Sequence, residues 1–106
     1  MYLILGNGNI PIPNELWLNT KYISVNNDLN YTPHIFYDIH NLPWTFAIDN
    51  AFEGIIDTSG IILRDHKKSK FLEEVQRILK PGGTFYSYDI ILFENTPLKK
   101  LFTLRK

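Results

Sequence analysis

The stretch FLEEVQRILKPGG, residues 71–83, limits the possible folds of this chain more than any other feature. Its apolar residues recur at positions i, i+1, i+4, i+7 and i+8, and polar residues fill the positions between them. This spacing predicts an amphipathic helix that packs one stripe against a sheet. The stripe consists of Phe71, Leu72, Val75, Ile78 and Leu79.

A sharp stop follows this helix. Lys80 suits the negative end of the helix dipole, and Pro81 cannot continue the helix. Gly82 or Gly83 can take the left-handed turn that redirects the chain. Residues 84–92 then read as a strand. A strand, a helix, a tight stop and a second strand form a right-handed crossover unit, which places parallel strands in one sheet.

Four earlier apolar runs predict further strands, at 2–5, 21–25, 34–38 and 52–57. The links between them are short. Prolines leave room for only one or two turns of helix near residues 15–18, and residues 29–33 are too few for a crossover helix, so no helix is expected there. The third strand is therefore either joined by an unusual loop or misplaced.

A last short helix is predicted near the C-terminus. Asn95 or Thr96 can cap it, and Pro97 suits its first position. Its inward face would consist of Leu98, Leu101 and Phe102. The whole pattern predicts a single α/β domain, 1–106, with a mostly parallel sheet of about five strands and abbreviated helices. One sheet face would be poorly covered, which predicts a homo-oligomer or a protein partner over that face.

Composition excludes several classes of function. Eleven basic and eleven acidic residues cancel, so no overall charge attracts nucleic acid, although the basic segments 64–70 and 99–106 leave that reading as a minor alternative. Cysteine is absent, which excludes disulfides and thiolate metal sites, and we expect no metal. The opening run reaches Gly6 after five residues, too short for a membrane span or a signal segment. We therefore expect a cytoplasmic protein.

Four segments in order resemble class I S-adenosylmethionine-dependent methyltransferases, in particular compact members of the type 11 kind. These segments are LILGNGN at 3–9, VNNDLN at 25–30, YDIHNLPW at 37–44 and RILKPGGTFYSYD at 77–89. The resemblance covers about residues 2 to 92 and implies a Rossmann-like fold. It also implies S-adenosylmethionine as cofactor, bound at the carboxyl ends of the strands.

The resemblance assigns the cofactor contacts residue by residue. Gly6, Asn7 and Gly8 would form the loop that approaches the cofactor. Asp28 would accept hydrogen bonds from the ribose hydroxyls, and Asp38 would accept one from the adenine amino group. The backbone of Ile39 would lie beside the adenine ring, with Leu42 or Trp44 against the face of the ring.

Simpler interpretations of the same residues stay open. The Gly6-Asn7-Gly8 run is also a common tight turn, and Asp28 is also a plausible solvated turn residue. Asp38 can cap the loop that follows it, and Trp44 can belong to the core. Ile4 departs from the family pattern, which usually has an acidic or amide residue two positions before the first glycine.

No catalytic residue is assigned from the sequence. The polar groups after the fourth strand are Asp57, Ser59, Asp65 and His66. His66 could serve as a base near neutral pH, and its neighbours Lys67 and Lys68 equally suit a solvated residue at a helix start.

Two functions follow. The first is a small S-adenosylmethionine-dependent methyltransferase with an unknown methyl acceptor. The second is an inactive methyltransferase-like fold that serves as an interaction or regulatory subunit. The retained Asp28 and Asp38 favour the first, whereas Ile4 and the abbreviated early helices favour the second.

Overall fold

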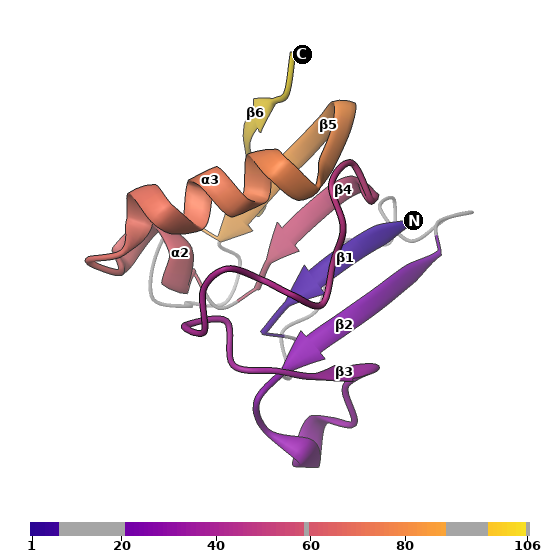
Figure 1. The fold of residues 1–106 in the computed structure, drawn as a ribbon, viewed down its shortest axis with the longest axis vertical. Helices are drawn as coiled ribbons and strands as arrows, with labels where there is room; N and C mark the ends of the chain where they lie inside the picture. The colour runs from indigo at the N-terminus through magenta and orange to yellow at the C-terminus, as the bar shows by residue number, and fades with distance from the viewer. Residues whose placement is uncertain (7–20, 59, 89–97, 106) are drawn as a thin grey trace.

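A computed structural model of the chain describes residues 1–6, 21–58, 60–88 and 98–105. These residues form one six-stranded sheet in the order β3-β2-β1-β4-β5-β6 (Figure 1). The strands are β1 (Tyr2–Leu5), β2 (Tyr22–Asn26), β3 (Ile35–Phe36), β4 (Phe52–Asp57), β5 (Leu79–Tyr88) and β6 (Leu98–Thr103). The first five are parallel, and β6 runs antiparallel to β5. The α/β class is therefore confirmed, with a mixed sheet of six strands instead of about five.

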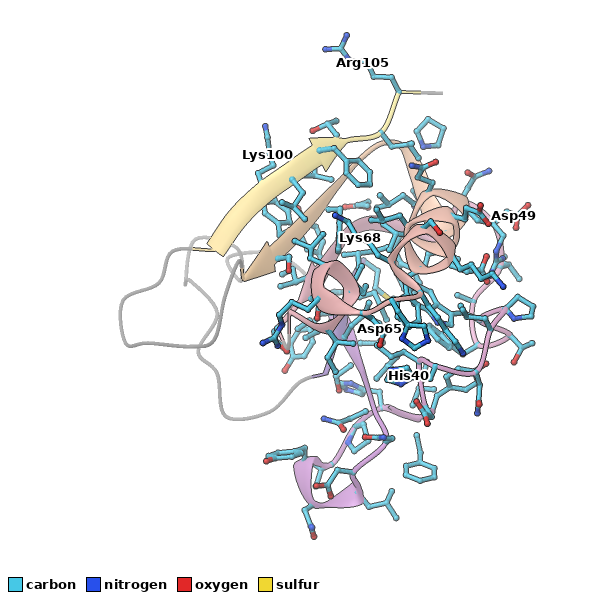
Figure 2. All side chains as sticks on the ribbon, turned by 90° about the vertical axis from the view of Figure 1, so that its left-hand side faces the viewer. His40, Asp49, Asp65, Lys68, Lys100 and Arg105 are labelled. Atoms are coloured by element: carbon cyan, nitrogen blue, oxygen red, sulfur yellow. The ribbon has the colours of Figure 1, made fainter. Side chains whose placement is uncertain are left out.

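The predicted C-terminal helix is wrong, because this segment forms β6 beside β5 (Figure 1 and Figure 2). Phe102 pairs with Phe85 while Lys100 pairs with Tyr86, so Leu101 is an extra residue in a bulge. The bulge breaks the two-residue alternation of a strand and produces an apolar spacing that resembles a helix. The predicted cap at Asn95, Thr96 and Pro97 lies outside the described residues.

The predicted helix is present as α3 (Lys68–Ile78), preceded by the short helix α2 (Ile61–Arg64). The helix ends one residue early, because Leu79 already belongs to β5 and pairs with Phe52. Gly82 takes the left-handed turn, with φ of 82°. Its N–H donates to the carbonyl of Leu104 at 2.8 Å, so the turn is also tied to the residue after β6.

The link between β2 and β3 is the unusual loop that the sequence left open. Val25 pairs with Ile35 in parallel register, and a single turn of 3-10 helix (Leu29–Tyr31) spans part of the link. The prediction that residues 29–33 contain no helix is therefore wrong, because this single 3-10 turn lies there. The hydroxyl of Ser24 lies 3.1 Å from His34 Nδ1 and holds the loop against the strand. The predicted helix near 15–18 lies outside the described residues.

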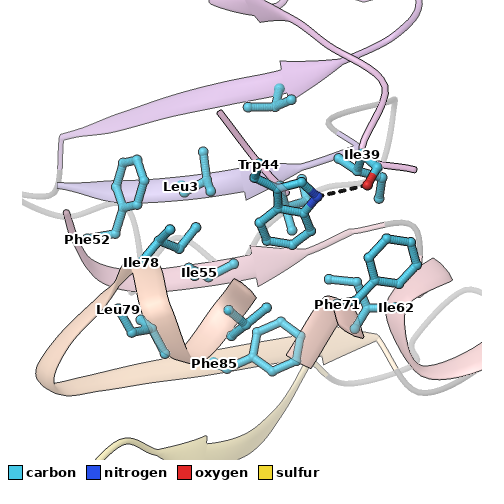
Figure 3. Packing of buried hydrophobic residues seen from close by; sticks show 13 residues of the cluster. Leu3, Ile39, Trp44, Phe52, Ile55, Ile62, Phe71, Ile78, Leu79 and Phe85 are labelled. Atoms are coloured by element: carbon cyan, nitrogen blue, oxygen red, sulfur yellow. Dashed lines mark hydrogen bonds between the residues drawn. The ribbon is translucent and has the colours of Figure 1, made fainter. Parts of the chain in front are cut away.

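One face of the sheet carries α2, α3 and the irregular segment 37–51 (Figure 1). The core lies beneath them, and Figure 3 shows Trp44 and Phe71 packed with the apolar side chains of the strands. Burying each large side chain there stabilises the fold by about 1.5–3 kcal/mol. On the opposite face Ile4 and Ile56 are also buried, so the exposed face predicted from the sequence is not found at these positions.

Candidate functional site

The strand order places a topological switch point between β1 and β4. From β1 the sheet continues to β2 and β3 on one side and to β4 and β5 on the other. Open α/β sheets bind ligands at the carboxyl ends of strands at such a point. The residues that follow these strand ends are therefore the ones to consider.

A small cleft of about 60 Å³ lies at these strand ends. It is formed by the end of β1, the end of β2, the loop after β3 and the first residue of α2. The polar and backbone groups that bear on binding come from Gly6, Asn26, Asn27, Asp38, Ile39 and His40. The cleft thus brings together three of the predicted site residues, namely Gly6, Asp38 and Ile39.

Gly6 is held in the conformation that the predicted loop requires. Its φ is 68°, a value that favours glycine, and its N–H donates to the carbonyl of Val25 at 2.9 Å. The buried Thr58 hydroxyl lies 2.9 Å from the carbonyl oxygen of Leu5 and 2.6 Å from that of Gly6. Thr58 therefore fixes the exit from β1, a role that sequence reasoning missed. Asn7 and Gly8 lie outside the described residues.

Ile4, which departs from the family pattern, lies away from the cleft residues described above. Its side chain is buried on the sheet face opposite the helices and packs with Ile56, Tyr2 and Tyr86. The residue therefore serves the packing of that face.

Asp28 is placed beside the cleft residues without lining the cleft itself. Its Oδ1 accepts a hydrogen bond from the Asn30 N–H at 2.9 Å and so caps the 3-10 turn. Its own N–H donates to Asn26 Oδ1 at 2.9 Å. Asn26 and Asn27 line the cleft in place of Asp28. The sequence prediction missed these two amides at the end of β2, because the resemblance assigned the ribose contact to the acidic residue that follows them.

Asp38 both lines the cleft and caps the loop that follows it. Its Oδ1 accepts a hydrogen bond from the His40 N–H at 3.0 Å and lies 3.0 Å from His40 Nδ1. The backbone hydrogen bond from His40 is the first cause that lowers the pKa of Asp38, and its side-chain hydrogen bond adds to the effect. The carboxylate is therefore ionised at neutral pH and is a strong acceptor.

Trp44 belongs to the core and holds the backbone of Ile39, one of the residues that line the cleft. Its side chain is buried, and its Nε1–H donates to the carbonyl of Ile39 at 2.8 Å (Figure 3). The ring stacks on Phe71 with a centroid distance of 6.1 Å. Leu42 is half-buried against the same core and does not line the cleft. Of the predicted adenine contacts, the structure therefore brings Asp38 and Ile39 to the cleft.

His40 contacts two carboxylates from separate parts of the chain, a role that sequence reasoning missed. Figure 2 labels His40 and one of these residues, Asp65. Its Nδ1 lies 3.0 Å from Asp38 Oδ1, and its Nε2 lies 3.1 Å from Asp65 Oδ2. The hydrogen bond to Asp38 is the first cause that raises the pKa of His40, and the hydrogen bond to Asp65 adds to it. No sequence signal links residues 40 and 65, because only the fold brings them together.

The other polar groups after β4 have structural partners or lie in solvent. Asp57 is fully buried, and its two carboxylate oxygens accept hydrogen bonds from the N–H groups of Gly60 and Ile62, each at 3.1 Å. It therefore caps the start of α2. The side chain of His66 is 85% exposed and lies 3.3 Å from Asp65, which fits the solvated interpretation of this residue. Ser59 lies outside the described residues.

Two kinds of feature are absent from the described residues. Within residues 1–6, 21–58, 60–88 and 98–105, no group of three or more His, Cys, Asp or Glu side chains is arranged to hold a metal ion. Of the helices in this part of the chain, none is long and apolar enough to cross a membrane.

Comparison with known proteins supports the fold. No protein-family model matches the chain, and no curated protein matches it. Its structure is similar to a chain of the solved complex between the Haloferax volcanii Trm112 methyltransferase activator and its candidate methyltransferase. The TM-score is 0.57 with 23% identity, over 81% of this chain and 43% of that one. The chain thus spans less than half the length of that protein, and at this identity the similarity shows a methyltransferase-like fold.

Proposed function

We propose that this chain binds S-adenosylmethionine in the cleft and is a methyltransferase domain. The observation that carries the proposal is the cleft at the carboxyl ends of β1 and β2, which Asp38 and Ile39 line together. The cleft lies beside the switch point of the sheet, where open α/β sheets bind nucleotides, and the similarity to a methyltransferase-like fold supports the proposal.

The chemistry of the described residues fits the adenosine end of this cofactor. The ionised Asp38 can accept a hydrogen bond from the adenine amino group, and the fixed Ile39 backbone can lie beside the ring. Asn26 and Asn27 supply amide groups that suit the ribose hydroxyls. When bound, the cofactor supplies a methyl group already activated by its sulfonium. The task of the chain is then to bind and orient it.

Calorimetric titration with S-adenosylhomocysteine tests this proposal. We expect measurable binding that falls about tenfold or more in Asp38→Ala, because a charge-assisted hydrogen bond is lost. Asp49→Ala is the control, since Asp49 is an exposed carboxylate that pairs with Arg77 away from the cleft. No binding at millimolar S-adenosylhomocysteine would refute the proposal.

A pair of neighbouring variants decides which residue contacts the ribose. If Asn27 contacts it, Asn27→Ala weakens binding and Asp28→Ala leaves it unchanged, apart from a small loss of stability from the missing cap. The reverse result would assign the ribose to Asp28, as the resemblance implies. Chemical denaturation of both variants separates a folding defect from a binding defect.

A second candidate function, an interaction or regulatory subunit, is favoured by one group of exposed residues. Leu29 is 67% exposed and Phe36 is 61% exposed, at the edge of the sheet formed by β3. The methyltransferase-like protein of similar fold is held in a complex with an activator. This function predicts that the protein associates with itself or with a partner through the edge formed by β3. The variant Phe36→Ser should weaken that association. Sedimentation velocity over a concentration series measures the self-association, with Glu73→Ser as an exposed control on α3.

A further inference from the structure

The contact between Asp38, His40 and Asp65 ties together two segments that are far apart in the sequence. Asp38 and His40 lie in the loop after β3, and Asp65 is the residue that ends α2. His40 stands between the carboxylates, with one ring nitrogen 3.0 Å from Asp38 and the other 3.1 Å from Asp65. Figure 2 labels His40 and Asp65. We call this arrangement the His40 clamp.

Each carboxylate of the clamp also accepts one backbone hydrogen bond. Asp65 Oδ1 accepts it from the Lys67 N–H at 2.8 Å, and Asp38 Oδ1 accepts it from the His40 N–H at 3.0 Å. The His40 ring also meets Phe71 of α3 edge to face, with centroids 5.6 Å apart. The ring is therefore the group that joins the two carboxylates, and its contact adds to the single backbone hydrogen bond that each of them has.

The protonation state of His40 decides how many of these contacts can be hydrogen bonds. An imidazolium donates from both nitrogens, whereas a neutral imidazole donates from one and presents a lone pair at the other. When His40 loses its proton, one ring nitrogen therefore turns a lone pair toward a carboxylate, and the hydrogen bond between them is lost. The charged groups near the clamp are Lys67, close to Asp38, and His66, close to Asp65. From α3 the contact is the uncharged ring of Phe71.

The clamp lies at the cleft itself. Asp38 and His40 line the cleft, as does Ile61 at the start of α2. Asp65 lines an adjoining shallow hollow together with Ile61 and Arg64. The clamp therefore joins the two segments that border the cleft, and it holds the carboxylate that the proposed function assigns to adenine.

We propose that His40 is a positioning residue, whose imidazolium orients Asp38 for adenine and joins the loop after β3 to α2, so that adenosine-containing ligands bind best while His40 is protonated. This inference rests on the proposed function, because it concerns the same cleft. Binding then weakens as the pH rises through the raised pKa of His40 and one of the two hydrogen bonds is lost.

Two measurements test the inference separately from the proposed function. NMR titration of the free protein reports the pKa of the His40 ring, with no ligand present. We expect the pKa of His40 to lie above the ordinary value of a histidine and to fall toward that value in Asp65→Asn. A His40 that titrates at or below the ordinary value overturns the inference, whatever the cofactor does.

Calorimetry then measures the affinity for adenosine and for S-adenosylhomocysteine at about pH 6 and about pH 8.5, on either side of neutrality. Adenosine has no group that titrates in this range. We expect binding about two- to fivefold weaker at the higher pH, since the clamp is partly exposed. His40→Gln should bind at the weaker level at both pH values, whereas His66→Gln should behave as the unchanged protein.

The outcomes are distinguishable. Binding without pH dependence, or pH dependence that survives in His40→Gln, overturns the inference and leaves the proposed function intact. No binding of either ligand at any pH overturns the proposed function and the ligand part of the inference together. If His40→Gln fails to fold, Asp65→Asn serves in its place, because it leaves Asp38 and His40 unchanged and removes one charge from the clamp.

Discussion

Glu74 organises the irregular segment on the helical face of the sheet. It is buried on α3, and its Oε1 accepts a hydrogen bond from the Trp44 N–H at 2.6 Å. Its Oε2 accepts one from Arg77 Nε at 2.8 Å, and Arg77 Nη2 in turn donates to the Trp44 carbonyl at 2.9 Å. One carboxylate and one guanidinium thus replace the backbone partners that a helix or strand would give this segment.

Removing that carboxylate should destabilise the protein more than removing its neighbour. We expect Glu74→Ala to cost about 2–3 kcal/mol, because it leaves the Trp44 N–H without its acceptor and removes one of the two carboxylates that pair with the half-buried Arg77. Glu73→Ala, at an exposed position on the same helix, should cost less than about 0.5 kcal/mol. Urea denaturation of the two variants measures the difference, and equal losses would contradict the role of Glu74.

The Glu74 carboxylate also makes the stability of the protein depend on pH, with a loss of stability expected at acid pH. The hydrogen bond from Arg77 is the first cause that lowers the pKa of Glu74 in the folded protein. Its contribution is therefore present above the unfolded pKa and is lost as the pH falls through the folded one. The stability gap between the unchanged protein and Glu74→Gln should narrow on acidification. Thermal unfolding from neutral to acid pH measures it, and a gap that widens would refute this assignment.

At the scale of elements, the first half of β5 depends on two glycines for different reasons. Gly82 has a φ of 82° with open space around the missing side chain. A Cβ on Gly83 would instead lie 2.9 Å from the Lys80 carbonyl oxygen and 2.9 Å from Leu79 Cδ2. One glycine supplies a backbone conformation, and the other lets two backbone segments approach.

This difference predicts an order of stability. Gly82→Ala should cost about 1 kcal/mol from backbone strain alone. Gly83→Ala should cost more, about 2–3 kcal/mol, because a backbone atom must move. Guanidinium denaturation ranks the two variants, and a larger loss in Gly82→Ala would show that this account of the two glycines is wrong.

Elements with local sequence signals could be predicted, and elements set by distant contacts could not. The apolar runs at β1 and β4 predicted those strands with their observed bounds, because burial on a sheet imposes a pattern. The apolar stripe predicted α3, although this helix begins three residues before Phe71. The bulge at Leu101 hid β6 by breaking that period. Strand pairing with β5 is a property of the folded chain.

In the candidate site too, residues with a local sequence signal could be predicted, and residues brought together by distant contacts could not. Gly6 and Asp38 could be found because each follows a strand that the sequence marks, and the cleft gathers both. His40 and Asp65 could not, since their contact depends on how α2 lies against the loop after β3. Glu74 was read as part of the polar side of α3, and it is buried only because the segment with Trp44 packs over it.

At the scale of the whole molecule, stability should decrease from the centre of the sheet to its edges. β1 and β4 lie at the centre and are paired on both sides, whereas β3 is a two-residue edge strand. The described part of the core gathers over the central strands. The centre should therefore open only when the whole domain unfolds.

Amide hydrogen exchange measures this gradient. We expect the slowest exchange at Ile4, Ile55 and Ile56 in the central strands and much faster exchange at Phe36 on the edge. The contrast should persist at any pH where the protein is folded. Comparable protection of β3 and β1 would contradict the stability order and point to a covered edge.

The central position of β1 also dictates when the protein can fold. Tyr2 pairs with Gly54 and Leu5 with Asp57, so β1 gains its second neighbour only after half of the chain has been made. The helices that cover its core side come later still. Folding of the sheet centre therefore waits for these long-range pairings, and a chain with β4 unpaired leaves one edge of β1 open.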